Sequence, residues 1–194
     1  MKTVVFSKNK ELKKQIKILL RNEAIKLGKV FNFNISKVNV IVVDSKKEFE
    51  EFVGRKPYRW EVAVHKNGII IIFDPDKLFL KQYNGSNFSK ILAHEFVHLF
   101  YFHIIPIGVP YWLNEGLAYY LAEQSFTRLK YRGAKMRALN YFDKFDEKIY
   151  KYGPNLVSVL IEEYGLAEFI RRLKRFANTE KNKDDVLRCF LESE

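Results

Sequence analysis

Apolar residues from 8 to 27 recur with the three- and four-residue spacing of an amphipathic helix. Gly28 follows the last of them, and glycine at that point predicts the end of the helix. The short run 38–43 is rich in β-branched residues, which predicts a strand. Ser45 and Glu48 then form the capping-box pattern that starts a short helix. The N-terminal part is therefore predicted to contain a helix, a strand and a second helix, in that order.

A β-hairpin is the clearest local prediction. Residues 60–65 alternate polar and apolar side chains, and residues 69–73 are strongly β-prone. Asn67 and Gly68 stand between the two runs, and Asn-Gly is the preferred pair for a type I′ turn. The two runs are thus expected to pair antiparallel.

Beyond residue 78 the apolar pattern becomes helical. The expected helices are 87–102, 111–124, 136–148, 153–163, 167–176 and 184–191. Strands come first and helices follow, so we predict an α+β fold with a small N-terminal mixed sheet and a helical C-terminal half.

The composition is that of a globular protein. The chain has 194 residues, of which 47% are hydrophobic and 29% charged, and this balance excludes a disordered tail protein. Cys189 is the single cysteine, so an intrachain disulfide and a Cys-x-x-Cys site are excluded, which favours a cytoplasmic location. No run approaches the roughly 20 apolar residues of a transmembrane helix, so no membrane partner is expected.

The formal net charge of +11 raises the question of nucleic-acid binding. Residues 67–127, however, carry two more acidic than basic side chains, and the basic excess lies on either side of them. The middle segment also carries the candidate chemistry described next. Nucleic acid is therefore not the expected partner.

That chemistry begins with a H-E-x-x-H sequence inside an apolar helical run. Four residues correspond to about 400° of helix, so His94 and His98 project from one face and can bind a single zinc ion. Glu95 stands beside that face, where it can take a proton from a water molecule at the metal. The alternative is a pair of core histidines satisfied by hydrogen bonds.

A hydrolytic zinc site needs a third protein ligand. The segment 111–119 reads Y-W-L-N-E-G-L-A-Y, and its Glu115 would stand on a second helix. Together, H-E-x-x-H and the W-L-N-E-G helix resemble the signature of the gluzincin metallopeptidases. The resemblance implies His94, His98 and Glu115 as metal ligands, and Glu95 as the general base.

Further features follow from the same resemblance. Tyr150 begins a Y-K-Y-G sequence that is similar to one in aminopeptidase-like gluzincins, which implies that Tyr150 donates a hydrogen bond to the oxyanion. Tyr152 is the substitute candidate, and an ordinary packed tyrosine is the alternative. Gluzincins hold substrate on an edge strand, a role that would fall to residues 68–73. Their four consecutive isoleucines fit a central, buried strand equally well. His65, beside the turn, is expected on the surface.

The resemblance implies a zinc peptidase with one zinc ion per chain and an endopeptidase activity on peptides or unfolded proteins. The chain length favours a single domain, so we predict one zincin-like domain over 1–194. It would have an N-terminal helical extension (1–37), a catalytic core (38–176), which the resemblance covers, and a helical tail (177–194). The glycine-rich motif that binds a free amino terminus in exopeptidases is missing from the strand region, which disfavours an aminopeptidase.

Two alternatives stay open. The first is a basic module that binds nucleic acid or an acidic protein and keeps a structural or vestigial zinc site. The second is a latent peptidase that becomes active when a terminal segment, after about Thr179, is removed.

Overall fold

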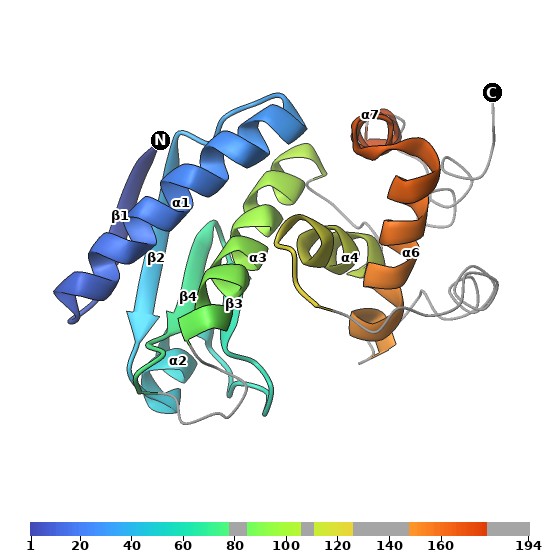
Figure 1. Ribbon diagram of the computed structural model, residues 1–194. Helices are drawn as coiled ribbons and strands as arrows, with labels where there is room; N and C mark the ends of the chain where they lie inside the picture. The colour runs from blue at the N-terminus through green and yellow to red at the C-terminus, as the bar shows by residue number, and fades with distance from the viewer. Residues whose placement is uncertain (78–84, 106–110, 126–147, 178–194) are drawn as a thin grey trace. The chain divides into compact units, whose positions relative to one another are not determined.

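The chain consists of two compact units. The computed structural model describes residues 1–77, 85–105, 111–125 and 148–177 (Figure 1). The first unit is Met1–Leu99 and the second is Phe100–Glu194. The sheet belongs to the first unit, and the described part of the second is helical, which confirms the predicted α+β class. The single-domain assignment and its bounds stay a prediction. The expected helices 136–148 and 184–191 lie mostly or wholly outside the described residues.

The first unit is built on a four-stranded mixed sheet. Its strands, in spatial order, are β1 (Lys2–Phe6), β2 (Lys37–Val43), β4 (Ile69–Phe73) and β3 (Ala63–Lys66). β1, β2 and β4 run parallel, and β3 is antiparallel to β4. Because β4 lies between β2 and β3, the expectation that residues 68–73 form an edge strand is wrong and the central-strand alternative is correct. β3 is the edge strand.

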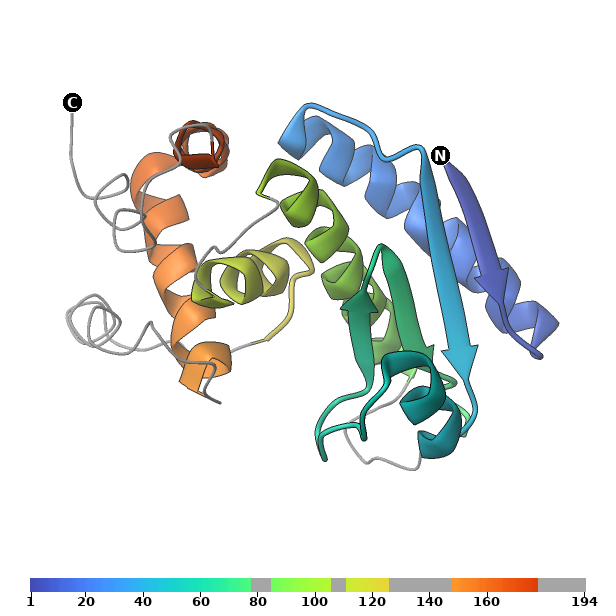
Figure 2. The ribbon, with the colours of Figure 1, turned by 180° about the vertical axis from the view of Figure 1, so that it is seen from behind.

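Helices cover both faces of this sheet. α1 (Lys10–Phe31) and the first-unit part of α3 (Gly85–Ile104) lie over one face (Figure 1). α2 (Lys46–Val53) packs on the other face, as the view from behind shows (Figure 2). The rings of Phe49 and Phe73 stack there, with centroids 5.0 Å apart. The core of the first unit therefore lies on both sides of β2 and β4.

At the N-terminus one local prediction was wrong and one strand was missed. α1 does not end at Gly28 but continues to Phe31, and Asn32 ends it in the left-handed conformation with a φ of 53°. The extra turn buries the side chain of Phe31 completely, which explains why the helix continues through the glycine. The strand β1 was not expected; residues 1–37 thus contribute a strand to the sheet as well as a helix.

Other local predictions are confirmed. Asn67 and Gly68 have φ angles of 51° and 76°, the positive values that a type I′ turn requires at both central positions. The hydroxyl of Ser45 accepts a hydrogen bond from the backbone N–H of Glu48 and starts α2. The Glu48 carboxylate accepts a bond from the Asp44 N–H, one residue before the position that the capping box predicts.

The described second unit is made of helices. They are α4 (Tyr111–Leu121), α6 (Lys148–Tyr164) and α7 (Leu166–Ala177), together with the last residues of α3. α4 packs extensively on α6. Gly165 joins α6 to α7 with a φ of 79°, a conformation that favours glycine. Within the described residues, none of the helices combines the length and the apolar character needed to cross a bilayer.

Candidate metal centre

The middle of α3 gathers two imidazoles and a carboxylate. His94 and His98 are four residues apart and project from one helix face, with ring centroids 4.7 Å apart and ring planes at 88°. The potential ligand atoms of His94, Glu95 and His98 all lie within 4.8 Å of one another. This is the group among the described residues that can hold a metal ion. The predicted local geometry of the H-E-x-x-H sequence is therefore present.

The spacing of the rings fits a shared ion. Metal–nitrogen bonds of about 2.0–2.1 Å in tetrahedral geometry place the centroids of two bound imidazoles roughly 5 Å apart. The observed 4.7 Å between His94 and His98 is close to this value without any movement of the helix. The residues present therefore fit a divalent cation of the kind that imidazole binds.

Burial makes this cluster unusual. The side chains of His94, Glu95 and His98 are only 6% to 8% exposed. Their neighbours on α3, Phe96 and Val97, are fully buried, so the helix is apolar around the cluster. Ionisable groups in such surroundings destabilise the fold unless they are hydrogen-bonded, paired or bound to a metal. A cation bound by the two imidazoles is one arrangement that would satisfy this requirement.

His65 lies next to this cluster, although the sequence suggested a surface position. Its ring centroid is 6.5 Å from that of His98. Burial lowers the pKa of His65 to about 4. Its Nε2 accepts a hydrogen bond from the backbone N–H of Gly68 at 3.2 Å, so this nitrogen is not directed to the metal ligands. His65 is half-buried, which is deeper than the surface position that the sequence suggested.

Strand register explains the position of His65. His65 pairs directly with Ile70 of β4, and directly paired residues share one face of a sheet. Ile70 is fully buried, and alternation along β4 places it on the face opposite to Phe73, which stacks on Phe49 of α2, so the imidazole points away from α2. The alternation along residues 60–65 is enough to predict that Ala63 and His65 share a face of the sheet. It does not indicate which helix covers that face.

The second unit carries Glu115 and Tyr150. Glu115 is half-buried on α4, with its Oε2 atom shielded from solvent, between the buried Asn114 and Gly116. Tyr150 lies in the first turn of α6 and is half-buried, as is Tyr152. The histidine cluster belongs to the other unit. The assignments of Glu115 as third ligand and of Tyr150 as hydrogen-bond donor stay predictions.

A close helix contact joins the two motifs of the second unit. A Cβ atom built on Gly116 would lie 2.5 Å from the carbonyl oxygen of Gly153, and one built on Gly153 would lie 2.6 Å from the carbonyl oxygen of Trp112. Only glycine allows the backbones of α4 and α6 to approach this closely. The glycines of W-L-N-E-G and Y-K-Y-G are therefore partners, a relation that the sequence alone did not reveal.

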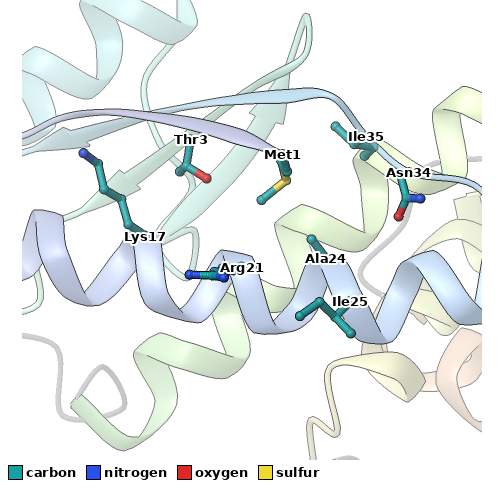
Figure 3. A pocket seen from close by; sticks show the side chains of 8 residues that line it. All are labelled: Met1, Thr3, Lys17, Arg21, Ala24, Ile25, Asn34 and Ile35. Carbon is teal, nitrogen blue, oxygen red and sulfur yellow. The ribbon is translucent and has the colours of Figure 1, made fainter.

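A separate cavity of about 610 Å³ opens in the first unit between β1 and α1 (Figure 3). Lys17 and Arg21 line it from α1, and Thr3 lines it from β1. None of the polar side chains that line it is buried. It contains no residue of the histidine cluster and adds nothing to the candidate metal centre.

Comparison with known proteins gives no independent support for a family. No protein-family model matches the chain, and no curated protein matches it in sequence. The resemblance to gluzincins therefore depends on the short motifs around His94, Glu115 and Tyr150.

Proposed function

We propose that this chain is a zinc-dependent peptidase of gluzincin type that cleaves peptide bonds within peptides or unfolded proteins. The observation that carries the proposal is the buried cluster of His94, Glu95 and His98, whose ligand atoms lie within 4.8 Å of one another on α3. Two imidazoles four residues apart on a helix bind the metal in a H-E-x-x-H zinc site, and the carboxylate next to the first of them serves as the general base. Glu115 from α4 would complete the ligand set.

Each side chain has a defined task in this proposal. His94, His98 and Glu115 would hold a zinc ion, which when bound supplies Lewis acidity and lowers the pKa of water. Glu95 accepts the proton of the attacking water on its carboxylate and passes it to the leaving amine nitrogen. The neutral phenol of Tyr150 donates a hydrogen bond to the oxyanion, where negative charge develops in the transition state.

The edge strand β3 supports an extended substrate. The N–H of Phe73 donates to the carbonyl of Val62 at 3.1 Å, which marks Val62 as a hydrogen-bonded partner of β4. Because pairing alternates along an antiparallel strand, the backbone groups of Ala63 and His65 point to the outer edge. A peptide paired at that edge would pass beside His65, whose ring is close to His98.

The decisive experiment compares Glu95→Gln with wild type. Zinc content is measured after metal loading, and hydrolysis is measured on a reduced, carboxymethylated protein. We expect about one zinc per chain in both proteins and a loss of about 10²–10⁴-fold in hydrolysis for the variant, because the general base is removed. Glu50→Gln, an exposed change on α2, is the matched control and should keep full activity.

Two results would overturn this proposal. Hydrolysis by Glu95→Gln at the wild-type rate would remove Glu95 from the mechanism. Nucleic-acid binding that falls steeply with salt and survives His94→Ala, together with no hydrolysis by wild type, would favour the basic binding module instead.

A further inference from the structure

An exposed aromatic stack lies just before the edge strand β3. The rings of Tyr58 and Trp60 are stacked, with centroids 5.5 Å apart and planes within 9°. The guanidinium of Arg55 lies over the Tyr58 ring, 4.6 Å from its centroid. Tyr58 and Trp60 are nevertheless 47% and 44% exposed. We call these two rings the aromatic platform.

The buried carboxylate of Glu61 holds this platform in place. Glu61 is 8% exposed and makes two charged hydrogen bonds with the Arg55 guanidinium, at 2.6 and 2.7 Å. It also accepts a bond from the Tyr58 N–H, and its own N–H donates to the Tyr58 carbonyl, both at 3.1 Å. These bonds fix both ends of the turn from Tyr58 to Glu61. The aromatic rings are therefore preorganised for binding.

The platform is close to the edge strand along the chain. Only Glu61 and Val62 separate Trp60 from Ala63, the first residue of β3, and Val62 already pairs with β4. From His65 to Trp60 the chain covers at most about 16 Å at roughly 3.3 Å per residue. A peptide that lies along β3 from the metal centre would therefore reach the platform within about five residues.

We propose that Tyr58 and Trp60 form a distal subsite that binds an aromatic or large aliphatic side chain of an extended peptide substrate. This inference rests on the proposed peptidase function and adds a preference several residues from the cleaved bond. Ordered, half-exposed Trp and Tyr rings offer large apolar contact at little entropic cost. The Arg55 charge is matched by Glu61, so an apolar side chain suits the platform better than an anionic one.

The test uses the zinc-loaded full chain and quenched fluorescent peptides. One series is lengthened residue by residue at either end, with alanine or phenylalanine at the outermost position. For wild type, we expect kcat/KM to rise about three- to tenfold when a phenylalanine reaches the platform, through a lower KM. Trp60→Ala should abolish that rise and leave cleavage of the shortest peptide unchanged.

Phe6→Ala is the matched control, because Phe6 is 58% exposed at the end of β1, on the opposite edge of the sheet. It should preserve the rise. A second test is a fluorescence titration, in which Trp60 is not mutated. The chain has two tryptophans, and because Trp112 is fully buried, a ligand at the surface should change the emission of Trp60. The long phenylalanine peptide should therefore shift the emission of Trp60 in the Glu95→Gln variant, and the alanine peptide should not.

The outcomes separate the two proposals. Cleavage of all peptides with no dependence on Trp60, or an equal loss for short and long peptides in Trp60→Ala, overturns the distal subsite and leaves the peptidase intact. An unchanged Trp60 emission in the titration overturns it as well. If wild type cleaves no peptide of any length, the peptidase proposal itself fails.

Discussion

Gly116→Ala should destabilise the second unit through the contact between α4 and α6. The new methyl carbon would lie 2.5 Å from the carbonyl oxygen of Gly153 and 2.6 Å from a methyl carbon of Val157. Ordinary van der Waals contact begins at 3.4 Å, so the helices must separate by roughly 0.9 Å at this point. The oxygen belongs to backbone and cannot rotate away.

The expected magnitude follows from two opposing effects. Alanine is intrinsically better than glycine in a helix by about 1 kcal/mol. Overpacking of a well-filled contact destabilises by about 1–3 kcal/mol, and a rigid backbone partner favours the upper part of that range. We therefore expect Gly116→Ala to lower the free energy of unfolding by about 1–2 kcal/mol.

Gly28→Ala on α1 is the control for Gly116→Ala. Its methyl carbon would also lie 2.5 Å from an oxygen, but this oxygen belongs to the exposed side chain of Asn34 and can move. Gly28→Ala should therefore be neutral or stabilising by up to about 1 kcal/mol. For a chain of this length the two variants should differ in Tm by about 4–8 °C, measured by circular dichroism. Equal Tm values would refute the close packing at Gly116.

Two further predictions concern acidic side chains. Hydrogen bonds from Arg171 and Arg172 lower the pKa of Glu168 to about 2, so its carboxylate stabilises the fold above the ordinary pKa of 4.5 and loses this effect as the pH falls toward 2. The stability difference between wild type and Glu168→Gln in urea should therefore be constant from pH 6 to 8 and shrink below about pH 5; a difference that persists at pH 2 would contradict this. Glu115→Gln should weaken zinc binding in competition with a chelator, whereas the control Glu163→Gln should not; equal affinities would exclude Glu115 as a ligand.

Local chemistry explains which parts of the fold could be predicted. The turn at Asn67 and Gly68 and the start of α2 at Ser45 depend on residues within four positions of each other, and both were predicted correctly. β1 depends on parallel pairing with β2 across about 30 residues of chain, which no local pattern reports. The end of α1 likewise depended on the burial of Phe31 and not on Gly28.

In the candidate site, too, the local features could be predicted and the long-range ones could not. Histidines four residues apart on a helix must share a face, so the arrangement of His94 and His98 could be predicted from spacing. The approach of His65 to His98 depends on which helix covers the hairpin, and the contact of Gly116 with Gly153 depends on how two helices cross. Such relations arise only from tertiary packing, and short motifs do not contain them.

The simplest alternative to a metal site is a cluster in which Glu95 pairs with its two histidine neighbours and no ion is bound. In that case Glu95→Gln would leave buried imidazoles without their counter-charge, and the fold should lose stability. In a metal site the ion is itself the charge partner, so Glu95→Gln should keep the ion and most of the stability while hydrolysis is lost. Both interpretations begin from the same cost, because three buried ionisable groups make this helix turn less stable than an apolar one, so the stability and the zinc content of Glu95→Gln together distinguish them.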